Sequence, residues 1–354
     1  MINLIFKVIG LTIILISAFL AWHWMGISQF AEQPIGITEP VDFDLQRGAH
    51  LRDIAQQLEQ QKIIDDAQYL VWLARLESLD RNIKAGEYQI SGEMTPRTLL
   101  QHFVKGKVKQ YALTVIEGWT FQQLISALHD HPKIKHSLQN TAGLAVMAKI
   151  GRSGEHPEGQ FLPDTYHFPR GTSDINFLRR ANVALHRVLN EAWQNRRLDL
   201  PYKTPYEALT MASIVEKETA ISAERPQIAG VFVRRLQKNM RLQTDPTVIY
   251  GMGDSYQGNL RRKDLRKDTP YNTYVRKGLT PTPIALPSRH AIESALNPAE
   301  GDTLYFVAKG TGFHHFSKTL AEHNQAVKSY QLTPRRNYRS YPQSSTAQNE
   351  SIQE

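Results

Sequence analysis

The sequence contains no cysteine among its 354 residues, which excludes several kinds of site at once. Without cysteine the chain has no disulfide framework, no thiolate metal site and no thiol nucleophile. This composition fits a cytoplasmic protein, and equally a periplasmic protein that folds without disulfide bonds. A hydrophobic content of 41% and a charged content of 21% indicate a globular protein with a real core, long enough for two domains and a terminal segment.

Several common catalytic signatures are also missing from the sequence. No Gly-x-Ser-x-Gly elbow surrounds Ser213, and no glycine-rich loop of the phosphate-binding kind is present. His129, His131 and His136 lie close together in the sequence, but no His-Glu-x-x-His motif and no carboxylate at a zinc-ligand spacing accompanies them. We therefore expect no serine-hydrolase chemistry, no metal site and no cofactor.

The net charge of +8 and a pI near 9.4 favour anionic surroundings, such as phospholipid headgroups, acidic wall polymers or nucleic acid. A nucleic-acid-binding surface would need basic residues interleaved with aromatic residues on a recognisable motif. The densest basic run, residues 261–267, contains no aromatic residue. We interpret this run as a solvated face and expect no nucleic-acid partner.

Residues 8–25 form an apolar run without Asp, Glu, Lys or Arg, and Trp22 and Trp24 lie at its far end. The run is long enough to cross a bilayer, and tryptophans are typical of the interface where a helix leaves the membrane. Because Lys7 and the amino terminus precede the run, the positive-inside rule predicts a cytoplasmic segment at residues 1–7 and export of the rest. This predicts a single-pass protein of the inner membrane with a periplasmic catalytic domain.

A cleaved signal peptide is the alternative interpretation of this apolar run. Such a peptide would end in a small-x-small cleavage site, but Phe19 and Ala21 flank Leu20. Retention as an anchor is therefore favoured, followed by a linker at residues 26–40. Both interpretations place the remainder of the chain outside the cytoplasm.

A pattern of strand, glycine turn and short amphipathic helix recurs after this linker. The segments are residues 41–58 around Gly48, a looser copy at residues 88–100 around Gly92, and residues 112–128 around Gly118. Small α+β domains often have this pattern. It also resembles LysM domains, which bind glycan chains, so we expect a LysM-like α+β module at residues 41–130.

The most informative stretch is a predicted helix at residues 206–219. An apolar stripe formed by Ala208, Met211, Ala212 and Val215 is continued by Glu218. A carboxyl group on the buried face of a helix, near the negative end of its macrodipole, has a raised pKa and can act as a general acid near neutral pH. The alternative is that Glu216, Lys217 and Glu218 mark the solvated end of the helix.

The rest of the chain alternates further helices with segments rich in glycine, proline and polar residues. We expect helices at residues 174–193 and 226–236, a polar turn within residues 240–251, a last strand at residues 304–308 and a disordered tail at residues 333–354. Residues 155–168 are too rich in proline, glycine and aromatics for a regular helix. A segment of this kind either closes the edge of a core or lines a sugar site.

Five motifs carry a family resemblance. They are Glu158-Gly159-x-Phe161-Leu162-x-Asp164-Thr165-Tyr166, Ala212-Ser213-Ile214-Val215-Glu216-Lys217-Glu218-Thr219, Leu242-Gln243-Thr244-Asp245-Pro246-Thr247-Val248, Tyr271-Asn272-Thr273-Tyr274 and His314-x-Phe316. In this order they resemble the endolytic murein transglycosylases of the MltG (YceG-like) family, and the resemblance spans nearly the whole chain. Five motifs in order are far more specific than any one of them.

The resemblance implies an α+β protein with an N-terminal transmembrane helix, a small LysM-like module and a mixed α+β catalytic domain at residues 131–332. Its implied activity is cleavage of the MurNAc–GlcNAc β-1,4 bond in nascent glycan strands, which leaves 1,6-anhydroMurNAc ends and terminates elongation. The implied partners are peptidoglycan glycan strands, the inner membrane and peptidoglycan synthases (penicillin-binding proteins).

By the same resemblance, Glu218 corresponds to the catalytic glutamate of the family and would act first as an acid and then as a base. Further residues are expected to bind the saccharide, although turn capping or core packing would explain each of them equally well. They are Glu158, Asp164, Tyr166, Gln243, Thr244, Asp245, Tyr271, Asn272, Tyr274 and His314.

Two other functions remain open on the sequence. A muramidase-type hydrolase would use Glu218 together with Asp164, Glu216 or Asp245, because ordinary glycosidases need two carboxyl groups. A membrane-anchored scaffold that binds peptidoglycan without catalysis is the second alternative.

Overall fold

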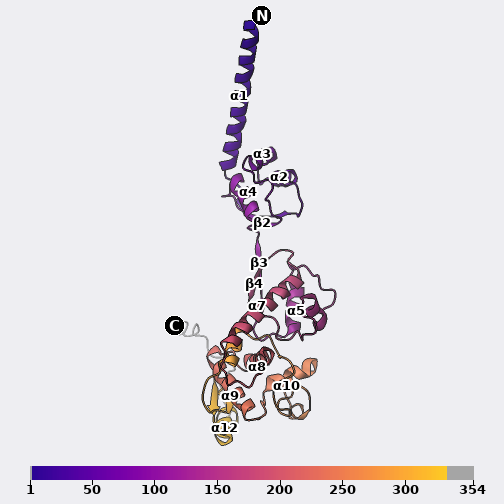
Figure 1. Ribbon diagram of the computed structural model, residues 1–354, viewed down its shortest axis with the longest axis vertical. Helices are drawn as coiled ribbons and strands as arrows, with labels where there is room; N and C mark the ends of the chain where they lie inside the picture. The colour runs from indigo at the N-terminus through magenta and orange to yellow at the C-terminus, as the bar shows by residue number, and fades with distance from the viewer. Residues whose placement is uncertain (1, 333–354) are drawn as a thin grey trace, which may run out of the picture. The chain divides into compact units, whose positions relative to one another are not determined.

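The computed structural model describes residues 2–332 and has the expected mixed α+β fold, with an apolar helix at its N-terminus. The chain divides into two compact units (Figure 1). The first comprises the described part of Met1–Ala112 together with His167–Gly171, and the second comprises Leu113–Tyr166 and the described part of Thr172–Glu354. The tail predicted to be disordered, residues 333–354, lies outside the described residues.

The first unit packs helices against a two-stranded antiparallel sheet. Its elements are α1 (Ile2–Glu32), β1 (Val41–Leu45), α2 (Leu51–Gln60), α3 (Ala67–Leu76), β2 (Gly86–Ile90) and α4 (Pro96–Lys105). In the sheet Val41 of β1 lies opposite Ile90 of β2. Phe43, Tyr88 and Phe103 are fully buried between the sheet and α4, so the apolar face of this short sheet forms the centre of the unit.

Helix α1 contains a segment, Ile5–Glu32, that is long and apolar enough to cross a membrane. This segment suggests membrane anchoring, although a signal sequence would have the same length and composition. The helix continues through residues 26–32, which were expected to belong to a linker. The physical reason is packing, because Ile27, Phe30 and Ala31 contact the hydrophobic core of the first unit.

The predicted strand–turn–helix segments are present. β1 leads to α2, β2 leads to α4, and β3 (Gln110–Thr114) leads to α5 (Phe121–Asp130). Gly48 and Gly118 have φ angles of +84° and +75°, which a residue with a Cβ adopts only at a cost. At the start of α4, Thr95 is the N-cap residue and Pro96 stands in the first turn. The second unit begins at Leu113, within the predicted boundaries of the LysM-like module.

The second unit is mostly helical. Besides α5 it contains α6 (Gly143–Lys149), α7 (Asp174–Gln194), α8 (Pro205–Glu218), α9 (Arg225–Gln237), α10 (Asp245–Met252), α11 (Arg289–Leu296), β5 (Tyr305–Ala308), β6 (His314–Ser317) and α12 (Leu320–Val327). The helices predicted at residues 174–193 and 226–236 correspond to α7 and α9, and the last predicted strand corresponds to β5. Strand β4 (Thr165–Pro169) pairs with β3, and both strands are divided between the two units.

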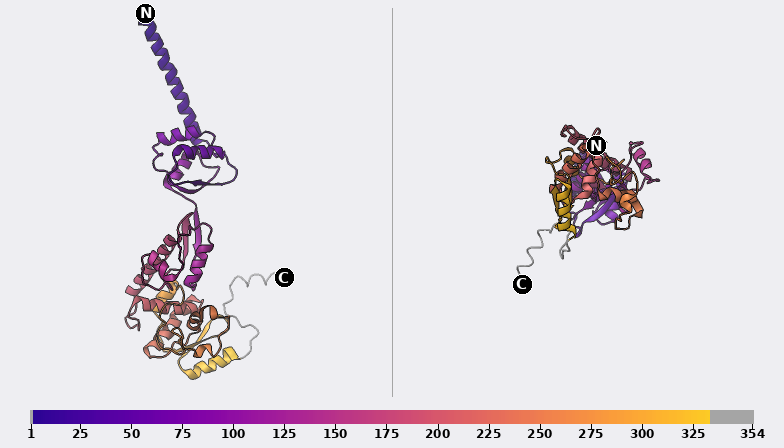
Figure 2. Two further views of the ribbon diagram at one scale, coloured as in Figure 1. Left: turned by 90° about the vertical axis from the view of Figure 1, so that its right-hand side faces the viewer. Right: turned by 90° about the horizontal axis from the view of Figure 1, so that it is seen from below.

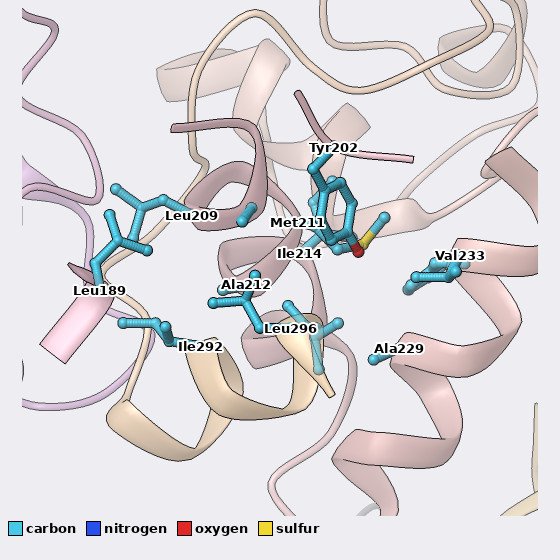
Figure 3. Packing of buried hydrophobic residues seen from close by; sticks show 14 of the residues in the cluster. Leu189, Tyr202, Leu209, Met211, Ala212, Ile214, Ala229, Val233, Ile292 and Leu296 are labelled. Carbon is cyan, nitrogen blue, oxygen red and sulfur yellow. The ribbon is translucent and has the colours of Figure 1, made fainter. Parts of the chain in front are cut away.

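Helix α8 is the centre of the second unit. Residues 208–216 are all buried, against side chains that include Leu189 of α7, Val233 of α9 and Leu296 of α11 (Figure 3). The predicted single apolar stripe was therefore too narrow, because a helix buried on every side carries small and apolar residues all round. The Thr204 side chain caps the helix by accepting a hydrogen bond from the Glu207 N–H. The helix ends at Glu218, the point at which it leaves the core.

Gly92→Ala should destabilise the first unit, because a Cβ at this position would overlap the carbonyl oxygen of Ile37. We expect a loss of about 1–3 kcal/mol in the free energy of unfolding, since backbone atoms must move to make room. Thermal unfolding of the full chain in detergent measures the effect. Gln89→Ala, on the exposed face of β2, is the matched control, and equal melting temperatures for the two variants would contradict the packing described here.

Candidate active site

A groove of about 560 Å³ in the second unit brings together the C-terminal end of α8, the start of α10, the β5–β6 hairpin and α12. In the left view of Figure 2, α12 is drawn in yellow beside this hairpin. The polar lining includes Glu218, Arg235, Gln243, Thr244, Asp245, Tyr274 and His314. The lining thus comes from several separate segments between residues 218 and 331.

Glu218 is the last residue of α8, and its partly buried carboxyl group lines this groove. Burial raises the pKa of the Glu218 carboxyl to about 7, and the nearby charge of Asp245 acts in the same direction. The hydroxyl group of Thr244 donates a hydrogen bond to Oε1 of Glu218 and, like the charge of Arg235, opposes this rise in pKa. Near neutral pH the carboxyl group is therefore divided between its acid and base forms, which suits proton transfer in both directions.

The residues that follow Thr244 place a second carboxylate in the groove. Asp245 is the first residue of α10, and its Oδ1 accepts a hydrogen bond of 2.6 Å from the hydroxyl group of Tyr274. Gln243, the residue before Thr244, has a φ angle of +54°, a left-handed conformation that is uncommon for a residue other than glycine. Its N–H donates to the carbonyl oxygen of Thr273, which holds this conformation in place. Backbone strain of this kind concentrates at functional sites.

Arg235 of α9 fixes two walls of the groove to each other. Its Nε donates to the carbonyl oxygen of Leu304 at 2.6 Å, and its Nη1 donates to that of Leu242 at 2.8 Å. The guanidinium group also lies over the ring of Tyr305, 5.0 Å from the ring centre. Arg235 therefore connects the segment before Thr244 to strand β5, and nothing in the sequence pattern indicated this role.

Glu216 lies two residues before Glu218 but has a different environment. Its Oε1 accepts a hydrogen bond from Arg225 at 2.7 Å, and its Oε2 accepts bonds from the N–H and hydroxyl groups of Ser288. Burial raises the pKa of Glu216, whereas the bonds from Ser288 and the charge of Arg225 lower it. This buried network joins α8 to α9 and to the N-cap of α11, so Glu216 has a structural role.

The predicted saccharide-binding residues fall into two groups. Half of them line the groove with Glu218, namely Gln243, Thr244, Asp245, Tyr274 and His314. The other half, Glu158, Asp164, Tyr166, Tyr271 and Asn272, lie outside its lining. For this second group saccharide binding stays a prediction, and the structure shows what each side chain contacts instead.

Glu158 is buried, and it accepts hydrogen bonds from the N–H of Phe121 at 2.9 Å and from the hydroxyl group of Tyr250 at 3.2 Å. Burial raises the pKa of Glu158 to about 7. Tyr250 also packs against the ring of Tyr271, with the ring centres 5.0 Å apart. The Glu158 carboxylate therefore joins α5 to α10.

The remaining three residues have local structural contacts. The Tyr166 hydroxyl group donates to the carbonyl oxygen of Leu162 at 2.7 Å, and burial raises the pKa of Tyr166. The Asn272 side chain donates to the carbonyl oxygen of Lys267 at 2.7 Å and supports the turn before Tyr274. Asp164 is exposed, and its side chain accepts a hydrogen bond from the N–H of the residue that follows it.

Several groove residues were missed at the sequence level. Tyr305 and Phe306 come from β5, and His323 and Asn324 come from α12. One signal for α12 was present, because Thr319 and Glu322 form a capping box at its start. The position of this helix against β5 and β6 depends on contacts between distant segments, which no local pattern encodes.

Volume alone does not single out this groove. A second cavity of about 560 Å³, lined by Tyr206, Thr210 and Leu279 among others, is equally large. Within residues 2–332, no group of three or more His, Asp or Glu side chains lies close enough together to hold a metal ion. The groove at Glu218 is the better candidate because it combines an acid of raised pKa, a second carboxylate and aromatic walls.

The chain is similar to known proteins in sequence and in fold. The model of the YceG-like family matches residues 43–329. The endolytic murein transglycosylase of Bacillus subtilis strain 168 is 31% identical over 307 residues, which cover 82% of this chain and 84% of that protein. The endolytic murein transglycosylase of Streptococcus pneumoniae strain D39 is 27% identical over 323 residues, and the match covers 82% of this chain and 58% of that protein. A crystal structure of a yceG-like protein from Listeria monocytogenes superposes with a TM-score of 0.51 at 32% identity, covering 81% of this chain and 99% of the other.

The raised pKa of Glu218 predicts a pH-dependent cost to stability. Between pH 4.5 and about 7 the carboxyl group ionises in the unfolded chain but stays largely neutral in the folded one, so stability falls as the pH rises. Glu218→Gln removes this loss and should gain up to about 3 kcal/mol over the unmodified protein across that interval. Urea unfolding of both full-length proteins at several pH values tests this, and a difference independent of pH would contradict it.

Proposed function

The chain belongs to the YceG-like family, and on that premise we propose that it is an endolytic murein transglycosylase with Glu218 as its catalytic residue. It cleaves the MurNAc–GlcNAc β-1,4 bond within nascent glycan strands and terminates their elongation. The observation that carries this proposal is a desolvated glutamic acid, with a pKa of about 7, in the lining of a groove. A lytic transglycosylase needs one such group.

The proposed reaction uses the two protonation states of Glu218 in turn. The neutral acid protonates the glycosidic oxygen while the bond from this oxygen to C1 of MurNAc breaks. The resulting carboxylate then takes the proton of the MurNAc C6 hydroxyl group as its oxygen bonds to C1, which forms the 1,6-anhydro ring and restores the acid. The nucleophile belongs to the substrate, so high effective molarity favours ring closure and no water has to be positioned.

The groove residues supply contacts suited to an amino-sugar chain. The Asp245 carboxylate, bound by Tyr274, and the Gln243 amide are placed to bind sugar hydroxyl groups. Tyr305 and Phe306 offer aromatic surfaces on which pyranose rings can pack. Saccharide binding by Glu158, Asp164, Tyr166, Tyr271 and Asn272 would require a part of the glycan outside this groove.

The remaining features of the proposal concern location and partners. Residues 8–25 of α1 anchor the protein in the inner membrane by a single pass, with Lys7 on the cytoplasmic side and the second unit in the periplasm. Residues 41–130 form a LysM-like module that binds glycan strands, a role that their strand–turn–helix segments support. Peptidoglycan synthases are the proposed protein partners because they produce the nascent strands.

A muramidase-type hydrolase is the second candidate, and one observation favours it. Of the possible second carboxylates, Asp245 lines the groove with Glu218. The Glu216 carboxylate already accepts hydrogen bonds from Arg225 and Ser288, and Asp164 lies outside the lining of the groove. Hydrolysis would therefore use Asp245 to activate water, and it would leave reducing ends instead of anhydro ends.

Glu218→Gln should lower the rate of cleavage of uncrosslinked glycan strands at least about 1000-fold, since an amide cannot donate the required proton. Mass spectrometry of the products formed by the unmodified full-length protein should show 1,6-anhydroMurNAc ends. Products that carry one added water would instead establish the hydrolase. Full complementation of a deletion strain by Glu218→Gln would favour a scaffold without catalysis.

The pH dependence of cleavage should also report on Glu218. Because the acid form must protonate the leaving oxygen, kcat/KM should fall about tenfold for each pH unit above about 7. Thr244→Val removes a hydrogen bond that lowers the Glu218 pKa, so this decline should begin at a higher pH. Thr114→Val, at an exposed site on β3, is the control, and identical pH profiles for all three proteins would contradict the assignment.

A further inference from the structure

The side chains of Glu224 and His314 form a close pair, and His314 belongs to the lining of the groove. Oε1 of Glu224 accepts a hydrogen bond from the backbone N–H of His314 at 2.8 Å, and Oε2 lies 2.8 Å from Nδ1 of the same residue. Both side chains are largely buried, since 9% of the Glu224 side-chain surface and 13% of the His314 side-chain surface are exposed. Two contacts to one carboxylate fix both the backbone and the ring of His314.

This contact determines the hydrogen-bonding character of the ring. A carboxylate accepts hydrogen bonds, so Nδ1 of His314 carries a proton and donates a hydrogen bond to Glu224. In the neutral ring the other nitrogen, Nε2, then has a free lone pair and acts as an acceptor. Nε2 is also the ring nitrogen left available to a ligand.

His314 belongs to the same groove as Glu218. It begins strand β6 opposite Ala308 of β5, whose small side chain also lines the groove. Phe306 packs edge-on against the imidazole, with the ring centres 5.5 Å apart and the planes at 89°. The ring is therefore held on two sides, and the groove lies on a third.

Glu224 is also connected to the backbone at the end of α8. Its Oε2 lies 3.5 Å from the hydroxyl group of Thr219, the residue that follows Glu218. The same hydroxyl group accepts a hydrogen bond from the N–H of Ile221. One buried carboxylate thus contacts both the segment next to the catalytic acid and the histidine of the opposite strand.

We propose that Glu224 holds His314 in the Nδ1–H tautomer so that Nε2 accepts a hydrogen bond from the amino sugar in the groove. The donor on the sugar is a ring hydroxyl group or an acetamido N–H. Glu224 is a positioning residue, and His314 is the residue that contacts the substrate. This inference rests on the proposed glycan-cleaving function and adds a specific recognition contact to it.

Glu224→Gln tests the proposal with little change in shape. The Gln oxygen can still accept the His314 N–H, but its amide donates to Nδ1, so the ring proton must move to Nε2. We expect kcat/KM for glycan strands to fall about tenfold, the value of one hydrogen bond together with the unpaired group left behind. Nitrogen NMR of histidine-labelled full-length protein, above about pH 8, where histidine is ordinarily neutral, should show the change of tautomer. An Nδ1–H tautomer in both proteins, or a doubly protonated ring, would overturn the proposal.

A pair of substitutions at His314 separates substrate contact from a structural role. Gln at this position can place a polar atom near the site of Nε2, whereas Asn places one near Nδ1 and can keep the contact with Glu224. The proposal expects His314→Gln to retain at least about fivefold more kcat/KM than His314→Asn. The reverse order would show that the contact with Glu224 stabilises the fold without binding sugar.

His315 offers matched controls, because successive residues of a strand point to opposite faces and His315 is not part of the groove lining. His315→Gln and His315→Asn should cleave glycan as the unmodified protein does. The same assays distinguish the two levels of inference. If the unmodified protein yields no anhydro ends, the proposed function fails; if it yields them and Glu224→Gln keeps full kcat/KM, the role of the Glu224–His314 pair alone fails.

Discussion

The withdrawal of the Glu218 carboxyl group from water is the physical constraint on which the rest of the site depends. Helix α8 is buried on every side for most of its length, and its last residue enters a groove before it reaches bulk solvent. Desolvation is the largest influence on this carboxyl group and raises its pKa to about 7. The packing of α7, α9 and α11 around α8 therefore does more than stabilise the second unit, because it also keeps the carboxyl group of the proposed catalytic residue largely out of water.

Two glutamates of the same helical turn show how neighbouring contacts assign different roles. Both carboxylate oxygens of Glu216 accept hydrogen bonds, from Arg225 and Ser288, and these bonds join α8 to α9 and α11. Glu218 accepts one hydrogen bond from Thr244 and otherwise faces the groove. A third glutamate, Glu224, is committed to His314. Glu216 and Glu224 are buried and Glu218 is partly buried, but the identity of the hydrogen-bond donors separates the three carboxyl groups most clearly.

Local patterns predicted the parts of the fold whose signals lie within one segment. The strand–turn–helix segments and the positions of α7, α8 and α9 follow from glycine turns and helical spacing. Helix α10 was missed because Thr244, Asp245 and Pro246 also favour a turn, and eight residues give little periodicity. Likewise, the pairing of Arg235 with Leu242 and Leu304 joins distant segments, so the sequence could indicate the acid but not the walls around it.

The continuity of α1 with the first unit has a mechanical consequence. Phe30 and Ala31 belong to the hydrophobic contacts of that unit, and the ring of His23 packs edge-on against Trp72 of α3. If α1 is embedded in a bilayer, contacts of this kind would couple its rotation to that of the unit it carries. Tilting or spinning of the anchor in the lipid would turn the first unit as a solid body, so the angular freedom of that unit would be set by the membrane and not by a flexible tether.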